Sequence, residues 1–257
     1  MFEISVIIVL LMLLSGFIKG FVGFGFSMVL IVVLLDMGIK QTELMPILVP
    51  LFVVLDILLY IEHRKHINIK TVDYQTNFAL HPTTLMTTFV GVLLGTYLLL
   101  EFDVEILKLF FAISVLIILT LLIYKVDKHQ IKVPDERQNV AFGSFAGLLT
   151  GLFTLNGIVA TIYLLYHQYP KEKYMAVLVT FLLLSDIILV SVYLFAGLFT
   201  ISGLILSMQI LLIVLVGFYG GVFMRNYVSA RLFKLVIITI LGANSGKIII
   251  EFILAAL

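Results

Sequence analysis

The chain has 257 residues, of which 62% are hydrophobic and only 12% are charged. With a mean hydropathy of +1.23, it has too few charges to cover a water-soluble body of this size, which excludes a globular enzyme. The net charge of +1 gives no reason to expect a nucleic-acid partner. Because cysteine is absent and the five histidines are scattered, we expect no metal site and no cofactor.

Apolar runs separated by short charged breaks follow one another along the whole chain, which predicts an all-α polytopic membrane protein in a lipid bilayer. A membrane-spanning helix needs about 20 apolar residues. No basic region precedes the first run, so we expect no signal peptide. The runs cover 3–36, 43–61, 77–100, 104–125, 139–166, 174–197, 201–224 and 229–256.

The first and fifth runs differ from the others because glycine and polar residues interrupt them. Helix propensity is weakest at such positions, so we predict a broken, re-entrant or kinked helix in each. The first half-helix would cover 3–18, about 24 Å at 1.5 Å per residue, which is long and would require a tilt. The interruptions are Gly16, Gly20, Gly23 and Gly25 around Lys19, and Gly143, Gly147, Gly151 and Gly157 around Thr154 and Asn156.

The two halves of the chain resemble each other, which indicates a tandem duplication. We interpret 1–257 as a single transmembrane domain of two repeats, 1–126 and 137–257, joined by a linker at 127–136. The matching residues are Gly91 and Gly95 with Gly217 and Gly221 at an offset of 126, Asp56 with Asp186 at an offset of 130, and Gly16 and Gly20 with Gly147 and Gly151 at an offset of 131.

The distribution of lysine and arginine favours inverted repeats, because cytoplasmic loops collect basic residues. If both interrupted runs return to the side they entered from, each repeat has three full crossings. Basic residues of 64–70, 125–137, 171–173 and 225–234 then all face the cytoplasm. If all eight runs cross, the last two groups are stranded outside. We therefore predict two inverted repeats, each with one glycine-broken helix and three transmembrane helices, and the N-terminus outside.

Inverted repeats with interrupted helices are typical of secondary transporters, which hold the substrate where the helix ends meet. Unpaired N–H groups and the positive end of a helix dipole attract an anion there. The alternative is that glycines only permit close helix packing, which we favour for the Gly-x3-Gly pairs of the 77–100 and 201–224 runs. The candidate substrate residues are Lys19, Gly20, Gly23, Gly25 and Ser27 in the first repeat, with Gly151, Thr154, Asn156, Gly157 and Thr161 in the second.

Lys19 is the most informative single residue, because a cation within the membrane is costly and usually marks a pathway or an ion pair. It either compensates an anionic substrate, or snorkels or pairs with Asp56 or Asp186. Either carboxyl group could carry a coupling proton, since removal from water favours the neutral acid, or it could be a structural hydrogen-bonding group. His81 and Thr180 are further candidates, for a vestibule beside the site.

The ordered motifs of this chain resemble the sulfite exporter (TauE/SafE) or toluene-sulfonate uptake permease family. The resemblance implies a transporter in the bacterial inner membrane that moves sulfite, thiosulfate, sulfonates or related anions with the proton gradient. After Gly25, Phe26-Ser27-Met28 stands where the first glycine cluster of this family usually continues with adjacent glycines and a proline. The alternative function is that of an anion channel or a carboxylate transporter of the same fold. The sequence motifs of enzymes are absent, so we do not expect an enzyme. The sequence does not indicate the oligomeric state. The motifs are Gly16-x3-Gly20-x2-Gly23-x-Gly25, Tyr60 to Asn68, Gly91-x3-Gly95 with Glu105 to Leu109, Gly143 to Gly157, and Gly217-x3-Gly221 with Arg231 to Lys234.

Overall fold

The computed structural model describes residues 6–27, 30–31, 40–63, 81–123, 135–166, 171–225, 227 and 250. In these ranges all regular structure is helical, which confirms the predicted all-α class. The predicted run 229–256, apart from residue 250, lies outside the described residues, as does most of the linker 127–136. The helices are α1 (Val6–Val22), α3 (Gln41–His63), α4 (Pro82–Glu101), α5 (Val104–Ile123), α6 (Glu136–Phe153), α7 (Asn156–Tyr166), α8 (Lys171–Phe195) and α9 (Ile201–Arg225).

Local sequence signals explain several helix ends. α6 begins with a capping box, in which the Asp135 carboxylate accepts from the backbone N–H of Gln138 at 2.7 Å and the Gln138 side chain accepts from the backbone N–H of Asp135 at 3.2 Å. Pro82 opens α4, where its missing N–H costs nothing. α8 ends before Gly197, whose φ of +67° suits the left-handed position that follows a helix.

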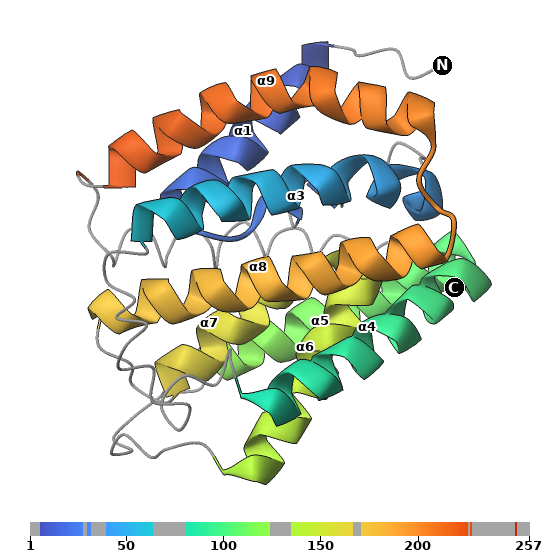
Figure 1. Ribbon diagram of the computed structural model, residues 1–257, viewed down its shortest axis with the longest axis vertical. Helices are drawn as coiled ribbons and strands as arrows, with labels where there is room; N and C mark the ends of the chain where they lie inside the picture. Colours follow the sequence, from blue (N-terminus) through green and yellow to red (C-terminus); the bar gives the residue numbers. More distant parts are fainter. Residues whose placement is uncertain are drawn as a thin grey trace.

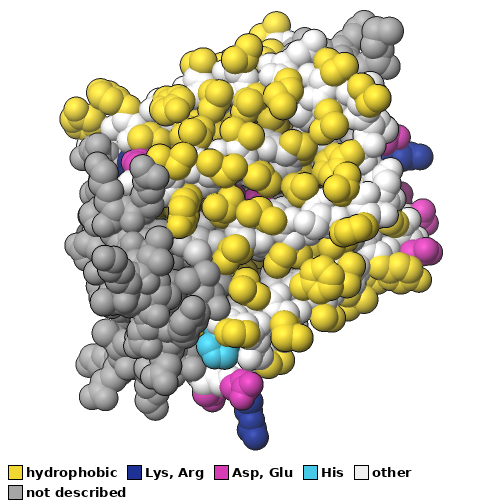
Figure 2. Space-filling view, in the orientation of Figure 1, with side chains coloured by type: hydrophobic (Ala, Val, Ile, Leu, Met, Phe, Trp, Pro, Cys, Tyr) yellow, Lys and Arg dark blue, Asp and Glu magenta, His cyan; other side chains and the backbone are white. Residues whose placement is uncertain are grey.

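The outer face of the bundle is apolar. Four of the described helices, α3, α4, α8 from Tyr174, and α9, are long and apolar enough to cross a membrane. Figure 2 shows hydrophobic side chains spread over α9, α3 and α8, with charged side chains at the edges of this face. Large side chains such as Leu212 and Phe223 are 70% and 65% exposed. A surface of this kind is stable in lipid and not in water, so the protein is embedded in the membrane.

Glycines bring two helix pairs into close contact, α1 with α9 and α4 with α6. A Cβ atom on Gly91 would lie 2.6 Å from the carbonyl oxygen of Ser144 in α6, and one on Gly217 would overlap the carbonyl oxygen of Leu13 in α1. The backbones therefore approach each other through the absence of side chains. This confirms the packing role predicted for two Gly-x3-Gly pairs, Gly91 with Gly95 in α4 and Gly217 with Gly221 in α9.

In each of the two close pairs, a helix of one repeat packs against a helix of the other repeat (Figure 1). By the sequence offsets, α1 corresponds to α6 and α4 corresponds to α9. The glycine-rich helix of each repeat thus packs against the matching partner helix of the other repeat. Between these pairs, α3 packs against α8, and they carry the matched carboxylates Asp56 and Asp186. The reciprocal contacts fit a duplicated fold, while the opposite membrane orientation of the repeats stays a prediction.

Both predicted helix interruptions are present. α1 ends at Val22, and Gly23 and Gly25 each have a φ of +91°; α6 ends at Phe153, and α7 begins at Asn156. The end predicted at residue 18 is wrong, since α1 has 17 residues and continues to Val22. At 1.5 Å per residue this is about 25 Å, more than half of a bilayer core of about 30 Å. Figure 1 shows α1 inclined to α3.

Candidate functional site

The site forms where the two helix breaks, residues 23–25 and 154–155, come together. The Ser27 hydroxyl donates to the carbonyl oxygen of Thr154 at 2.9 Å, across 127 residues of sequence. The Gln41 side-chain amide, at the start of α3, donates to the carbonyl oxygen of Leu152 at the end of α6. Carbonyl groups that the second break leaves without helical partners are therefore bonded by side chains of the first repeat.

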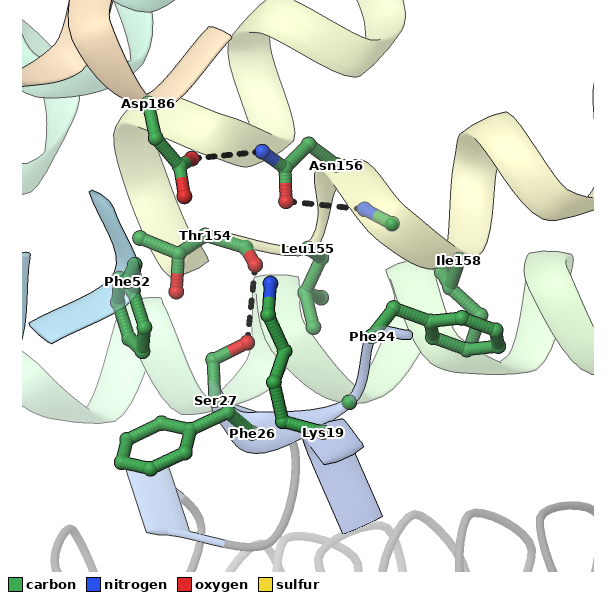
Figure 3. A pocket seen from close by; sticks show the side chains of 12 residues that line it. Lys19, Phe24, Phe26, Ser27, Phe52, Thr154, Leu155, Asn156, Ile158 and Asp186 are labelled. Carbon is green, nitrogen blue, oxygen red and sulfur yellow. Dashed lines mark hydrogen bonds between the residues drawn. The ribbon is translucent and has the colours of Figure 1, made fainter. Parts of the chain in front are cut away.

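A small cavity lies between the breaks (Figure 3). Its volume is about 10 Å³, which suits a single water molecule. An oxyanion of four or more heavy atoms therefore enters only if side chains in the wall move. The wall consists of Lys19, Phe24, Gly25, Phe26, Ser27, Phe52, Thr154, Leu155, Asn156, Gly157, Ile158 and Asp186.

A cation and two carboxyl groups from three helices meet at this cavity. Lys19 of α1 forms an ion pair with Oδ1 of Asp56 in α3. Asp186 of α8 lines the same cavity as Lys19. Lys19, Asp56 and Asp186 are 4%, 0% and 2% exposed. Buried charges are stable only when they compensate one another, and the ion pair with Asp56 compensates Lys19.

Asn156 connects the second break to the carboxyl pair. Its side-chain amide donates to Asp186 Oδ1 and to the Ser185 hydroxyl, both at 2.7 Å, and its side-chain oxygen accepts from the backbone N–H of Gly157 at 2.9 Å. These contacts orient the amide at the first residue of α7, as Figure 3 shows. A side chain at Gly157 would collide with Phe24, which occupies the space where a Cβ atom would lie. The second break is therefore fitted to a side chain from the first.

The second break contains a strained backbone. Thr154 has a φ of +52°, the only positive value of a residue other than glycine among those described. Its N–H donates to the carbonyl oxygen of Thr150 at 2.9 Å, and the N–H of Leu155 donates to that of Leu149 at 3.3 Å, which ends α6 tightly. A left-handed, β-branched residue costs about 1–3 kcal/mol, and such strain clusters at functional sites.

The structure brings eight of the fourteen predicted site residues into one place. Among the residues predicted to bind substrate or protons, Lys19, Gly25, Ser27, Thr154, Asn156, Gly157 and Asp186 line the cavity, and Asp56 joins them through its ion pair with Lys19. The pairing of Lys19 with an aspartate, one of the two alternatives in the sequence, is thus present.

The other predicted residues lie elsewhere. Gly20 and Gly151 face the backbones of α9 and α4 at the close helix contacts, and Gly23 lies against the methyl group of Met175, 3.1 Å from where its Cβ would be. These three glycines shape the packing around the cavity but do not line it.

Three polar candidates also lie away from the cavity wall. Thr161 accepts a hydrogen bond from the Tyr174 hydroxyl at 3.1 Å, nearly two helical turns beyond the second break. The Thr180 hydroxyl donates to the carbonyl oxygen of Ala176 at 2.8 Å, within its own helix. His81 is the N-cap residue of α4. None of the three lines the cavity.

Several residues of the site carried no signal in the sequence. Phe24, Phe26 and Phe52 form apolar walls of the cavity, and a phenylalanine in an apolar run does not differ from its neighbours. Gln41 is buried at the first turn of α3, although it lies at the polar edge of a run. Its polarity was the one clue, since a buried amide needs partners.

Comparison with known families identifies the family of this chain. Residues 8–248 match the family model described as sulfite exporter TauE/SafE. The chain belongs to the TauE/SafE family. Membership places this protein among membrane exporters of sulfite and related anions, which supports a transporter rather than an enzyme. No curated protein and no solved structure matches the chain.

In this TauE/SafE chain the donors around the cavity come from both repeats and already have partners within the protein. Lys19 pairs with Asp56, the Ser27 hydroxyl donates to Thr154, and the Asn156 amide donates to Ser185 and Asp186. The N-terminus of α7 at the cavity attracts negative charge. In the described part of the chain, no group of three or more His, Cys, Asp or Glu side chains is arranged to hold a metal ion.

Proposed function

We propose that this TauE/SafE protein is a secondary transporter that binds a small sulfur-containing anion between its two helix breaks. Sulfite, thiosulfate, sulfonates and related organic anions are the candidate substrates, coupled to protons and exposed alternately to each side of the membrane. The observation that carries the proposal is the burial of Lys19 at the junction of the breaks, beside the N-terminus of α7.

The chemistry of the cavity supports an anion rather than a cation or a neutral molecule. Lys19 supplies a positive charge once an anion displaces Asp56, and Ser27 and Asn156, from opposite repeats, can redirect to that anion the hydrogen bonds that they now donate within the protein. Sulfur oxyanions and sulfonates offer three or four acceptor oxygens at short range, which suits several donors around a small centre. Phe24 and Phe52 give the centre apolar walls, and apolar surroundings strengthen electrostatic contacts.

We further propose that the repeats have opposite membrane orientations, with the N-terminus outside and the protein in a bacterial inner membrane. The distribution of basic residues supports this orientation. The reciprocal packing of α1 with α9 and of α4 with α6 supports it as well. Opposed repeats allow alternating access, because one half can rock against the other around a fixed site.

A binding screen on purified protein tests the proposal. A ligand that binds only the folded state raises the free energy of unfolding, by about 2.7 kcal/mol at a hundred times its Kd. Melting temperature would be followed with sulfite, thiosulfate, taurine, sulfoacetate, sulfate and small carboxylates. The test variant is Lys19→Ala; the matched control is Lys40→Ala, which removes an exposed lysine just before α3.

We expect a sulfur oxyanion or sulfonate to stabilise wild type and Lys40→Ala but not Lys19→Ala. Stabilisation of Lys19→Ala to the same degree would move the binding site away from the breaks. Stabilisation by carboxylates alone would keep an anion transporter and refute the sulfur assignment.

A further inference from the structure

We propose that Asp56 and Asp186 form a proton-sharing carboxyl pair that limits the site to singly charged anions and takes up one proton for each anion bound. This inference rests on the proposed anion site and goes beyond it, since it fixes both the charge of the substrate and the proton count. Its basis is the placement of the three groups: Lys19 pairs with Asp56, Lys19 and Asp186 line one cavity, and all three are buried.

The cluster contains one positive group and two acidic groups, and it is isolated from other charges. Lys19, Asp56 and Asp186 are almost completely buried. On the same helix as Asp56, the nearest charged residue is Glu62, six residues away, about 9 Å along the helix axis, and it pairs with Arg225 of α9 at 3.3 Å. The other charged residues of the helices around the cluster lie toward helix ends: Glu43 in α3, Glu101, Asp103, Glu105 and Lys108 around the junction of α4 and α5, Glu136 and Arg137 at the start of α6, and Lys171, Glu172 and Lys173 at the start of α8.

With both carboxyl groups ionised, the cluster would carry an uncompensated negative charge inside the membrane. Such a charge is costly there, and two carboxyl groups around one lysine avoid it by holding one proton between them. Lys19 neutralises the remaining charge through Asp56. The Asn156 amide donates to Oδ1 of Asp186, which leaves the second oxygen of Asp186 for the shared proton. The cluster is then neutral.

Anion binding changes this balance by one unit. The cavity of about 10 Å³ is too small for an oxyanion while Lys19 is held by Asp56. The anion therefore replaces Asp56 as the partner of Lys19, and the freed carboxylate takes a proton from water, forming an O–H bond. One negative charge and one proton enter together, and the cluster is neutral again.

A doubly charged anion cannot be balanced in this way. Once both carboxyl groups are protonated, the pair has no further capacity, and a dianion on Lys19 leaves one negative charge uncompensated. The proposal therefore selects hydrogen sulfite and monosulfonates over sulfate, thiosulfate and the sulfite dianion. The sequence repeat supports a joint role for the pair, because the two aspartates are equivalent positions of the two repeats.

Isothermal titration calorimetry on the full-length protein counts the protons directly. Methanesulfonate is a suitable probe because it is a monoanion across the useful pH range, and sulfate serves as a dianion of similar size. Titrations in buffers with different ionisation enthalpies give the protons taken up per anion. Wild type should take up about one proton per methanesulfonate. Above the pH at which the carboxyl pair titrates, its affinity for methanesulfonate should fall about tenfold per pH unit. Sulfate should bind at least about a hundredfold more weakly.

Variants separate the carboxyl pair from other proton sites. In Asp56→Asn with Asp186→Asn, Lys19 alone balances the monoanion, so proton uptake should be zero and affinity independent of pH. Each single variant should still take up one proton per anion, because its remaining carboxyl group is ionised before the anion binds and protonated afterwards. This keeps the test valid if the double variant does not fold. Glu62→Gln is the matched control and should behave as wild type.

Methanesulfonate binding without proton uptake, equal affinity for sulfate, or zero uptake in one single variant would overturn the charge balance while leaving the anion site in place. Failure of wild type to bind any of the anions would overturn the anion site itself and this inference with it.

Discussion

Replacement of Gly221 by alanine should separate the contribution of close helix packing from that of helix propensity. Gly221 and Gly220 are neighbours on α9, but only the first faces the backbone of α1. A Cβ atom on Gly221 would lie 2.6 Å from the backbone nitrogen of Phe21 and closer still to the carbonyl oxygen of Phe17. On Gly220 it would lie 3.7 Å from the ring of Phe17, an ordinary van der Waals contact.

The magnitude follows from this geometry. Because the atoms that a Cβ on Gly221 meets are backbone, α1 must move outward by most of an ångström. Overpacking of this kind costs about 1–3 kcal/mol. The gain in helix propensity from glycine to alanine, up to about 1 kcal/mol, is common to both variants and cancels in their difference. With a shift of about 2–4 °C per kcal/mol for a domain of this size, Gly221→Ala should melt roughly 2–12 °C below Gly220→Ala.

The assay is thermal unfolding of both variants in the same detergent, followed by sulfite titration. α1 carries Lys19, so the displaced helix should also weaken sulfite binding in Gly221→Ala and not in Gly220→Ala. Equal melting temperatures would refute the close contact between α1 and α9. A lower melting temperature with unchanged sulfite affinity would show that the position of α1 does not control the site.

Three further substitutions test the contacts around the breaks. Thr154→Gly removes the left-handed strain and keeps the carbonyl group that Ser27 bonds, so the melting temperature should rise by the equivalent of about 1 kcal/mol. Ser27→Ala leaves that buried carbonyl without a partner, and a loss of about 1–3 kcal/mol is expected; an unchanged melting temperature would contradict the contact. Arg225→Gln frees the carbonyl oxygen of Gly20, which Arg225 bonds at 2.8 Å, so hydrogen exchange should accelerate at residues 19–23, and unaltered exchange would contradict this role.

The sequence was informative where the determinant is local. Glycine pairs spaced four apart predicted close helix contacts, and positions around Gly23 and Thr154 predicted helix breaks, because weak helix propensity and missing side chains act at the residues themselves. The same signal misled at the end of α1. The helix continues past Gly16 and Gly20 because α9 packs against them and stabilises the helical backbone, a tertiary effect that propensity does not contain.

The assembly of the site depends on contacts that no local pattern specifies. The sequence allowed Lys19 to pair with either of two equivalent aspartates, and in the folded protein its partner is Asp56. The contact of Gln41 with Leu152 spans 111 residues, and Phe24 fits against Gly157 from the other repeat. Long-range partners of this kind follow from how the repeats dock, which the sequence indicates only as a duplication.

Proton-driven uptake into vesicles is the most direct test of the account, in which a buried lysine between two helix breaks carries an anion with a proton. Purified protein would be reconstituted into liposomes, and sulfite followed while a pH gradient is imposed without a sulfite gradient. We predict that sulfite accumulates above its external concentration in the more alkaline compartment, and that Lys19→Ala abolishes this accumulation while Lys40→Ala retains it. Equilibration of sulfite that never exceeds the external concentration, with the pH gradient intact, would contradict coupled transport and identify a channel.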